Sequence, residues 1–320
     1  MISHIAHIFK KNIKKNIIIS NTHNGIRNSI IHFGSINLIL TPSGPNIPHH
    51  SNKVIVSYNH ILPNDNRHKF LDILINRVDI WHVTNSITQN NLMELGIPAE
   101  KIVLIPLGVD INKFKKSEID EKKLIKHKLG IPSDKIIIGS FQKDGNGWGE
   151  GLTPKLIKGP DIFCNVVKKL SKQMEVFVLL TGPARGYVKS RLEKENIPFK
   201  HFYLKDANSI NKFYKVLDIY FVTSRVEGGP MSVLESLASG VPLVSTKVGM
   251  AVDVIIHNHN GVLVDVEDED NFLNEVKLLL NNSKILKKQI LNGLKTASKY
   301  DWKLISKKTE KLYKRFQKDE

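Results

Sequence analysis

The 320-residue chain has a single cysteine, no long apolar run and fewer acidic than basic residues. With Cys164 as the only cysteine, an internal disulfide and a cysteine-based metal cluster are excluded, which favours a reducing compartment. No apolar run approaches the roughly 18 residues that a membrane-spanning helix needs. The apolar segment 16–19 is also too short for the core of a signal peptide. We therefore expect a cytoplasmic protein.

The shortage of acidic residues leaves a formal net charge of +16, from 47 lysines and arginines against 31 aspartates and glutamates. Such a balance suits an anionic partner, whether a phosphorylated substrate, an acidic lipid surface or nucleic acid. Lysine, asparagine and isoleucine are all abundant, so compositional bias accounts for part of the charge as well. Because the basic residues are scattered and no nucleic-acid-binding motif is present, we expect no nucleic acid partner.

Residues 1–15 place apolar side chains on one side of a predicted helix and lysines on the other. The apolar residues are Ile2, Ile5, Phe9 and Ile13, and the basic residues are Lys10, Lys11, Lys14 and Lys15. A basic amphipathic helix can lie on anionic lipid, as a peripheral contact with the inner face of the membrane. An ordinary packing helix or a frayed terminus explains the same pattern.

Hydrophobic residues make up 41% of the chain, enough for sizeable cores, and the length predicts two domains. Short apolar runs alternate with helical patterns in two series, which predicts an α/β fold with parallel, doubly wound sheets. The first series has strand candidates at 16–20, 37–41, 53–57, 79–84 and 101–106, with helices at 66–77 and 87–95. The second has strand candidates at 135–140, 175–181, 200–204, 218–223, 241–244 and 262–265, with helices at 160–173, 187–195, 208–216, 269–281 and 283–298.

The two series predict an N-terminal domain over residues 1–125 and a C-terminal domain over 126–300, followed by a last helix over 301–320. A lysine- and glutamate-rich helix at 116–128 lies near the predicted boundary. Ligands of doubly wound sheets bind beyond the carboxyl ends of the strands. We therefore expect the chemistry to lie between the two halves.

The stretch 220–248 reads as a strand, a glycine-rich turn, a helix ended by Gly240, and a second strand. Glu227 lies in the turn and Glu235 about one turn into the helix, with seven residues between the two carboxylates. The backbone N–H groups of a helix N-terminus lie between them and form a ready-made anion site. A purely structural glycine turn with solvated acids explains these residues as well.

The sequence EGGPMSVLESLASGVPLV of residues 227–244 resembles the E-x7-E signature of the retaining GT-B glycosyltransferases of family 4, the group 1 glycosyl transferases. Further segments similar to this family lie at 101–110, 139–141, 158–161, 260–264 and 300–302, so that the resemblance runs from about residue 53 to the end. It implies a GT-B fold, with two Rossmann-like domains facing a cleft. It also implies metal-independent, retaining transfer of a hexose from a nucleotide-diphospho-sugar to a saccharide or lipid-linked saccharide acceptor of a surface glycan.

The resemblance also implies roles for particular side chains. Lys158 would balance the charge of the donor diphosphate, a large term in such catalysis. Lys143 would be its second cation, although an insertion at 144–157 separates the two. Glu235 would accept hydrogen bonds from the ribose hydroxyls, which suits a carboxylate with two acceptor oxygens. Glu227 would contact the transferred sugar near the reacting carbon, and we count it as catalytic.

Two further groups of residues follow from the same family pattern. His60 follows a strand at a place where the family often has a histidine facing the sugar, and we count it as catalytic; among 13 histidines, an incidental one explains it equally well. Arg185 also follows a strand, but we expect a surface arginine. The backbone around the sugar and diphosphate would come from Gly228, Gly229, Pro230, Met231 and Ser232.

We expect no metal and no cofactor besides the nucleotide-sugar co-substrate. The acidic run 268–270 opens a predicted helix, where acids need no metal to explain them, and no His or Cys spacing suggests zinc. The N-terminal part departs from the family, because a single glycine, Gly25, follows the segment 16–20 and the domain is short. This departure leaves an alternative: a catalytically degenerate relative that binds sugar or nucleotide or scaffolds another enzyme.

Overall fold

A computed structural model of the chain describes residues 2–14, 16–41, 44–59, 61, 65–204, 206 and 209–316. The chain forms two compact units. Unit 1 comprises Met1–Gly108 and Tyr300–Glu320, and unit 2 comprises Val109–Lys299. The breaks between the units therefore lie at 108/109 and 299/300, where the sequence analysis placed them at 125/126 and 300/301. Within the described residues, no helix is both long and apolar enough to cross a bilayer.

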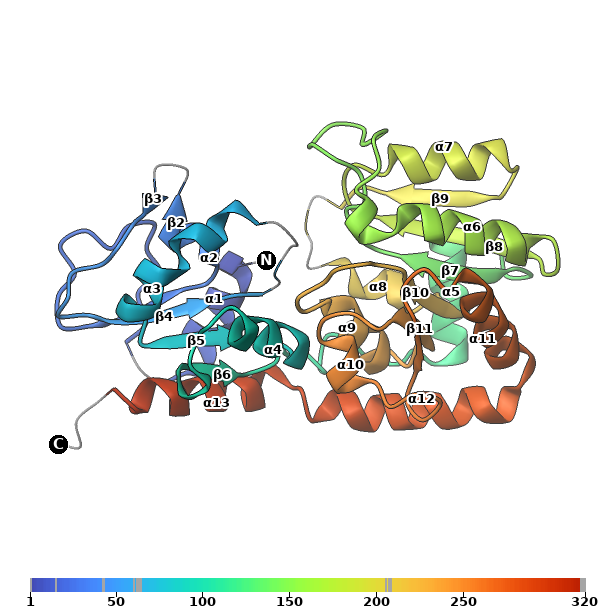
Figure 1. Ribbon diagram of the computed structural model, residues 1–320. Coiled ribbons are helices and arrows are strands. Elements are labelled where there is room, and N and C mark those ends of the chain that lie inside the picture. Colours follow the sequence, from blue (N-terminus) through green and yellow to red (C-terminus); the bar gives the residue numbers. More distant parts are fainter. Residues whose placement is uncertain are drawn as a thin grey trace. The chain divides into compact units, whose positions relative to one another are not determined.

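Unit 1 is built on a parallel sheet with the strand order β1-β4-β5-β6 (Figure 1). The strands are β1 (Ile30–Phe33), β4 (Lys53–Ser57), β5 (Ile80–Val83) and β6 (Ile102–Leu104). The residues of β5, and all but the first of β4, are buried, as expected for parallel strands covered on both faces. The helices are α2 (Ile36–Ile39), α3 (Leu71–Arg77) and α4 (Ser86–Glu94), and a short hairpin joins β2 (Leu40–Thr41) to β3 (Gly44–Pro45).

Three of the five strands predicted for this part of the chain are confirmed, as β4, β5 and β6, and two are wrong. Residues 16–20 form an irregular segment in which Ile18 is 78% exposed, and residues 37–41 belong to α2 and β2. The first strand of the sheet is β1, which was not predicted; its four residues include the polar His32. In the structure His32 finds hydrogen-bond partners in Ser57 and Tyr313, far away in the sequence.

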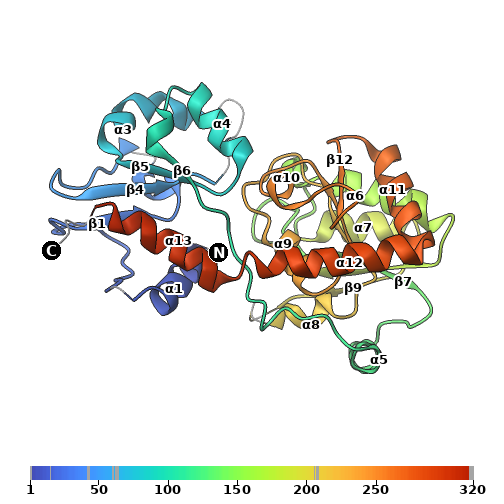
Figure 2. The same ribbon diagram turned by 90° about the horizontal axis from the view of Figure 1, so that it is seen from below.

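The two ends of the chain meet in unit 1, where α1 (Ile2–Asn12) packs against α13 (Trp302–Lys314) (Figure 2). The rings of Phe9 and Trp302 lie edge to face, with 6.1 Å between their centroids. The apolar side of α1 predicted from the sequence is therefore used, in part, for packing within the protein.

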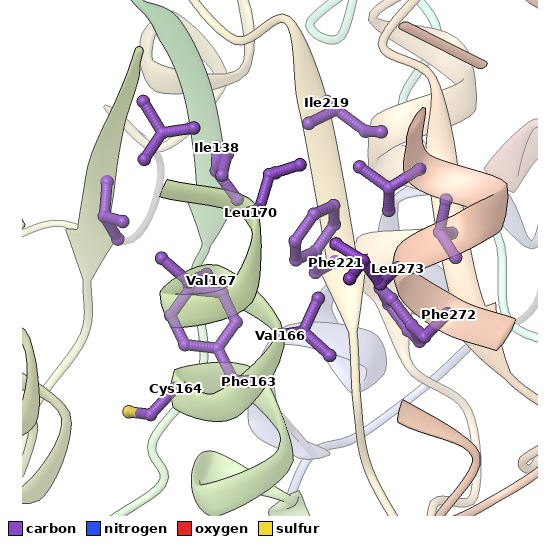
Figure 3. Close-up of a cluster of buried hydrophobic side chains, with 14 of the residues drawn as sticks. Ile138, Phe163, Cys164, Val166, Val167, Leu170, Ile219, Phe221, Phe272 and Leu273 are labelled. Atoms are coloured by element: carbon purple, nitrogen blue, oxygen red, sulfur yellow. The ribbon is translucent and has the colours of Figure 1, made fainter. Parts of the chain in front are cut away.

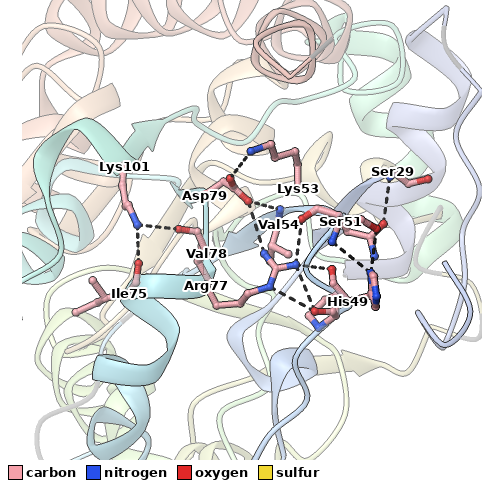
Figure 4. A network of polar contacts seen from close by, with 12 residues as sticks. Ser29, His49, Ser51, Lys53, Val54, Ile75, Arg77, Val78, Asp79 and Lys101 are labelled. Atoms are coloured by element: carbon pink, nitrogen blue, oxygen red, sulfur yellow. Dashed lines mark hydrogen bonds and ion pairs between the residues drawn. The ribbon is translucent and has the colours of Figure 1, made fainter. Parts of the chain in front are cut away.

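A polar network joins β4 to the connection between α3 and β5 (Figure 4). The guanidinium of Arg77 donates to the carbonyl oxygens of Asn52, at 3.0 Å, and His49, at 2.8 Å. The carboxylate of Asp79 accepts the backbone N–H of Val54 at 2.8 Å. These bonds satisfy backbone groups that the sheet ladder leaves unpaired at the start of β4.

Unit 2 contains a six-stranded parallel sheet in the order β12-β11-β10-β7-β8-β9. The strands are β7 (Ile136–Ser140), β8 (Val176–Thr181), β9 (Phe199–Phe202), β10 (Ile219–Val222), β11 (Leu243–Thr246) and β12 (Val262–Val264). The helices are α5 (Ile119–Leu129), α6 (Pro160–Ser171), α7 (Gly186–Lys194), α8 (Asn211–Tyr214), α9 (Met231–Ala238), α10 (Ala251–Val254), α11 (Glu269–Asn281) and α12 (Ser283–Ser298). The predicted second series is confirmed, with α8 shorter than expected.

The core of unit 2 lies between the sheet and helices α6, α7 and α11 (Figure 3). Phe221 of β10 is its aromatic centre, because its ring contacts Phe163 of α6 and Phe272 of α11 at 6.1 and 5.1 Å between centroids. Both contacts are edge to face, the arrangement that aromatic pairs prefer. This packing holds α6 and the end of β10 in fixed positions, on which the site described next depends.

Helix α5 belongs to unit 2 because ion pairs tie it to the segment before β10. Lys122 Nζ lies 2.6 Å from a carboxylate oxygen of Asp218, and Lys215 Nζ lies 2.5 Å from Oε1 of Glu121. These contacts explain why the observed break precedes the helix, whereas the sequence analysis placed it inside.

Candidate functional site

The strand order of unit 2 reverses between β7 and β10. From β7 the chain adds β8 and β9 on one side, and it then returns to β10 to add β11 and β12 on the other. Open parallel sheets bind their ligands beyond the carboxyl ends of the strands at such a point. Lys143 follows the end of β7 and Glu227 follows the end of β10, so both lie in the connections that leave this point.

Two of the predicted residues form an ion pair. Lys158 Nζ lies 2.6 Å from Oε1 of Glu227, and the hydroxyl of Ser224 donates to the same oxygen at 2.9 Å. The two charged side chains are only 22% and 13% exposed. A charge-assisted bond of this length is among the stronger hydrogen bonds in proteins. The structure thus brings together a cation and a carboxylate that lie 69 residues apart in the chain.

The position of Lys158 is set by a close approach of two backbone segments. Gly159 adopts a φ of +60°, and a Cβ atom there would lie 1.8 Å from the carbonyl oxygen of Thr223. The Thr223 hydroxyl in turn donates to the carbonyl of Gly159 at 2.9 Å. The backbone N–H of Arg225 donates to the carbonyl of Ile157 at 2.9 Å. Any residue but glycine at 159 would push the lysine turn away from the end of β10.

A second glycine supports the turn from the other side. Gly249, after β11, has a φ of +46°, and a Cβ there would lie 2.2 Å from the carbonyl oxygen of Gly228. The same oxygen accepts the backbone N–H of Met250 at 2.8 Å. The segment between β10 and α9 is therefore in close backbone contact with the Lys158–Gly159 turn and with the loop after β11.

The start of α9 provides the backbone donors that the sequence predicted. The helix begins at Met231 after Pro230, and no side chain caps its N-terminus. An uncapped helix N-terminus presents backbone N–H groups, and the helix dipole favours an anion there. The turn and the first helical residues consist of Gly228, Gly229, Pro230, Met231 and Ser232.

Glu235 lies in the second turn of α9 and is partly buried. Its Oε2 accepts a hydrogen bond from the hydroxyl of Tyr214 at 2.9 Å. Burial raises the pKa of Glu235 to about 7, although the Tyr214 bond and the charge of Lys113 act in the opposite direction. The side chain therefore carries its charge at an energetic cost that nearby groups only partly offset.

Lys155 is a functional candidate that sequence reasoning missed. Burial and the charges of Lys158 and Lys143 lower the pKa of its ammonium, and Glu227 raises it, so all three groups lie near it. The backbone N–H of Lys158 donates to the carbonyl of Lys155 at 2.8 Å. In so tight a turn, side chains three residues apart lie on the same side. The spacing of the two lysines was the signal available in the sequence.

Lys143 lies against the insertion. Its Nζ is 3.8 Å from the ring centroid of Trp148, a cation–π contact with an indole that is 84% exposed. It is close enough to Lys155 for their charges to interact, but its expected partnership with Lys158 stays a prediction.

Two other candidates have different outcomes. Arg185 is 1% exposed and not on the surface, so that expectation was wrong. Its guanidinium lies 3.1 Å from the buried carboxylate of Asp144 and donates to the carbonyl of Ser140 at 3.0 Å. The negative charge that pairs with Arg185 comes from Asp144 in the insertion at 144–157, and the sequence did not predict how this insertion folds. His60 lies outside the described residues, and its role stays a prediction.

Among the residues that the structure describes, no three His, Cys, Asp or Glu side chains are grouped as metal ligands would be. The acidic run 268–270 begins α11, as predicted. The carboxylate of Asp268 accepts the backbone N–H of Asn271 at 3.1 Å, and Lys169 lies 2.7 Å from Asp270. These contacts account for the run as a helix start.

Residues 152–296 match the family model described as glycosyl transferases group 1. Over 222 residues the chain is 25% identical to the UDP-Gal:alpha-D-GlcNAc-diphosphoundecaprenol alpha-1,3-galactosyltransferase of Escherichia coli, a match that covers 66% of this chain and 54% of that protein. It is 26% identical over 227 residues to the N,N'-diacetylbacillosaminyl-diphospho-undecaprenol alpha-1,3-N-acetylgalactosaminyltransferase of Campylobacter jejuni, covering 70% and 57%. The chain thus spans about half of the length of these relatives.

Solved structures of similar fold include a glycosyltransferase from Rickettsia africae ESF-5, with a TM-score of 0.73 at 18% identity, covering 100% of this chain and 81% of that one. They also include Anabaena HepE in complex with UDP-glucose, with a TM-score of 0.71 at 19% identity, covering 82% and 72%. The fold is therefore GT-B, with two Rossmann-like domains, as the sequence predicted.

Proposed function

We propose that this chain, a GT-B protein whose residues 152–296 match the group 1 glycosyl transferases, moves a hexose from a nucleotide-diphospho-sugar to a saccharide or lipid-linked saccharide. The transfer proceeds with retention of the anomeric configuration and without a metal ion. One observation carries the proposal: the Lys158–Glu227 pair lies at the strand switch point, beside an uncapped helix N-terminus.

In this reaction the bond between the anomeric carbon and the β-phosphate oxygen breaks, and its electron pair leaves with the nucleoside diphosphate. An acceptor hydroxyl oxygen bonds to the anomeric carbon on the same face, and its proton passes to the phosphate oxygen that leaves. Negative charge develops on the leaving phosphate, so fixed positive charges near it lower the barrier. The cations of Lys158 and Lys155, with the N–H groups of α9, supply that charge without a metal.

The carboxylates take the other two roles. Glu235 accepts hydrogen bonds from the ribose hydroxyls. These bonds take the place of hydrogen bonds from water, which reach the partly buried carboxylate only in part. Glu227, held by Lys158 and Ser224, contacts the transferred sugar near the anomeric carbon. When a diphosphate draws Lys158 toward itself, the Glu227 carboxylate becomes available to the sugar. His60 is proposed to face the sugar from unit 1.

The acceptor class rests on likeness to other proteins. The Escherichia coli and Campylobacter jejuni relatives are named for diphosphoundecaprenol-linked acceptors. We propose a saccharide or lipid-linked saccharide for this chain also, handled at the cytoplasmic side of a membrane, as in the assembly of a surface glycan.

The test is incubation with a panel of UDP-, GDP- and ADP-sugars, with and without lipid-linked and soluble saccharide acceptors, while nucleotide release is measured. We expect one donor to be consumed, at a rate that EDTA leaves unchanged. Loss of activity in EDTA would contradict metal independence. Binding of a nucleotide without turnover for any acceptor would instead favour a degenerate relative.

Variants make the same assay specific to the site. Glu227→Gln should lower kcat by at least about 100-fold if the carboxylate stabilises the transition state, since one such interaction contributes several kcal/mol. Glu175→Gln is the matched control, because that carboxylate is 80% exposed and pairs with Lys135 away from the site. A kcat of Glu227→Gln equal to that of the control would overturn the assignment of Glu227.

A further inference from the structure

Helix α13 carries a dense row of positive charge, and within the described residues the only ion pair of its basic side chains is Lys314–Glu310. Its apolar side is buried, with Trp302, Ile305 and Leu312 each no more than 5% exposed. Its other side is basic. The exposed basic residues of α13 and the turn after it are Lys303, Lys307, Lys308, Lys311, Lys314 and Arg315.

Helix α1 extends this basic surface, since it packs against α13 within unit 1 (Figure 2). Lys10 and Lys11 of α1 and Lys14 just after it are exposed, while Phe9 and Ile13 are buried. Residues 2–14 and 300–316 together hold nine basic side chains and two acidic ones, Asp301 and Glu310. We call the exposed basic residues of these two segments the α1/α13 surface.

The two acidic residues of segments 2–14 and 300–316 neutralise little of the positive charge of the α1/α13 surface. Asp301 caps α13 by accepting the backbone N–H of Lys303 at 2.7 Å. Glu310 lies 3.9 Å from Lys314, an exposed pair that contributes little. In unit 2, by contrast, lysines on α5 and α6 pair with acids at 2.6 and 2.7 Å. Like charges gathered without partners cost stability and suit an external anion.

We propose that the α1/α13 surface binds the acidic headgroups of a membrane by electrostatic attraction, without insertion of apolar side chains. Most apolar side chains of both helices are buried or half-buried within unit 1, although Ile2 and Leu304 are 38% and 43% exposed, so the mode differs from the amphipathic helix lying on lipid that the sequence of residues 1–15 suggested. Nucleic acid fits less well, because the aromatic rings of the described part of these segments, Phe9, Tyr300, Trp302, Tyr313 and Phe316, are buried or half-buried and offer no stacking platform.

This inference rests on the proposed function in one respect: the enzyme would encounter its lipid-linked acceptor at the membrane that the α1/α13 surface binds. Each lysine or arginine close to an acidic membrane contributes a factor of roughly five to partitioning. Because the attraction is between exposed charges, salt should weaken it strongly.

The test is sedimentation of the full chain with vesicles of phosphatidylcholine alone or mixed with phosphatidylglycerol, at low and high salt. We expect binding only to the acidic vesicles, lost at high salt. The quadruple variant K307Q/K308Q/K311Q/K314Q should bind at least about 30-fold more weakly, from the loss of four such contributions. The control K115Q/K123Q/K194Q/K247Q removes the same charge from scattered exposed positions of unit 2 and should bind nearly as well as the unaltered chain.

Equal losses of vesicle affinity in the two quadruple variants would overturn the assignment of membrane binding to the α1/α13 surface, because net charge alone would then drive binding. Binding that survives high salt, or tighter binding to duplex DNA than to the acidic vesicles at the same salt, would overturn the mode or the partner. Nucleotide binding, measured on the same samples by calorimetry, is expected to be unchanged in both variants. A failure of the vesicle test is thereby distinguishable from a failure of the proposed transferase function.

Discussion

Glu235 is a side chain whose burial costs stability. Its carboxylate is partly buried with one hydroxyl donor, Tyr214, and burial raises its pKa to about 7 from an ordinary 4.5. Because the folded state holds the proton more tightly than the unfolded one, this group's contribution to stability falls as the pH rises from 4.5 through 7. A nucleotide that donates two ribose hydroxyls to the carboxylate would reverse the cost.

We therefore predict that Glu235→Gln raises the free energy of unfolding above pH 7, by at most about 3 kcal/mol, while the gain vanishes near pH 4.5. The same variant should bind the donor nucleotide at least about 10-fold more weakly, because it loses hydrogen bonds to a charged acceptor. Urea unfolding at several pH values and calorimetric nucleotide titration measure the two effects. A variant that is more stable but binds nucleotide normally would remove Glu235 from the site.

Lys155 and Lys143 allow a direct comparison between a residue found in the structure and one predicted from the sequence. Lys155 shares a tight turn with Lys158, whereas Lys143 lies over Trp148. We predict that Lys155→Met raises the Kd of the nucleoside diphosphate by about 10-fold or more, and Lys143→Met by much less, since the loss of one charge-assisted bond costs about 1.5–3 kcal/mol.

The nucleoside monophosphate provides the internal control for this comparison. It lacks the second phosphate, so its affinity should change less in Lys155→Met than that of the diphosphate. A larger effect of Lys143→Met on the affinity for the diphosphate would contradict the assignment of Lys155 from the turn geometry. It would support Lys143, the second cation that the family pattern predicts.

At the scale of elements, the insertion at 144–157 is held in place by a buried ion pair. Asp144 and Arg185 are 0% and 1% exposed, with 3.1 Å between their charged atoms. Burial raises the pKa of Asp144 even though the Arg185 charge opposes the shift. Removing one partner would leave the other as an uncompensated buried charge, whereas removing both would leave none.

We predict that Asp144→Asn lowers the free energy of unfolding by about 3 kcal/mol or more, and that Arg185→Met does the same. The double variant should lose less than the sum of the two, by more than about 1 kcal/mol. Urea unfolding followed by far-UV circular dichroism measures all three. Additive losses would show that the two side chains do not act as a pair.

The elements also show which parts of this fold a sequence can predict. Most strands of unit 2 are apolar runs, with β9, which has Lys200 and His201 at its centre, as the exception, and all six were predicted to within a few residues. The glycine turn was predicted from a local pattern, and the same pattern made Glu227, Glu235 and Lys158 site candidates whose roles stay predictions. The strand β1 was not predicted, and the partners of its His32, Ser57 and Tyr313, lie far away in the sequence; Lys155 was missed because its neighbours are set by how the insertion folds. Both depend on partners distant in sequence.

At the scale of the whole molecule, unit 1 contains a chain of hydrogen bonds that holds α13 to the sheet. The hydroxyl of Tyr313 donates to His32 Nδ1 at 2.8 Å, and His32 Nε2 donates to Ser57 Oγ at 2.9 Å. Ser57 donates to His82 Nδ1 at 2.8 Å, and His82 Nε2 donates to the carbonyl of Ile105 at 2.9 Å. Burial lowers the pKa of both histidines, so both are neutral. With neutral rings, these directions follow from the one carbonyl at the end of the chain, which can only accept.

Acid should break this chain of bonds. Burial and the neighbouring His82 lower the pKa of His32 to about 3, from 6.5 in the unfolded chain. The unfolded state binds the proton more tightly, so stability is fully present above pH 6.5 and falls as the pH drops toward 3. We predict that His32 alone costs about 2 kcal/mol of unfolding free energy between pH 7.5 and 5.

Tryptophan fluorescence can assign this loss to unit 1. Trp81 and Trp302, both in unit 1, are 0% and 5% exposed, whereas Trp148 in unit 2 is 84% exposed in the folded state. The red shift of emission on unfolding therefore reports unit 1, while far-UV circular dichroism reports both units. In urea, the fluorescence midpoint should fall between pH 7.5 and 5, and His32→Gln should have a lower midpoint that depends less on pH, because it removes the titrating group. A His32→Gln midpoint with the same pH dependence as the unaltered chain would show that another group titrates.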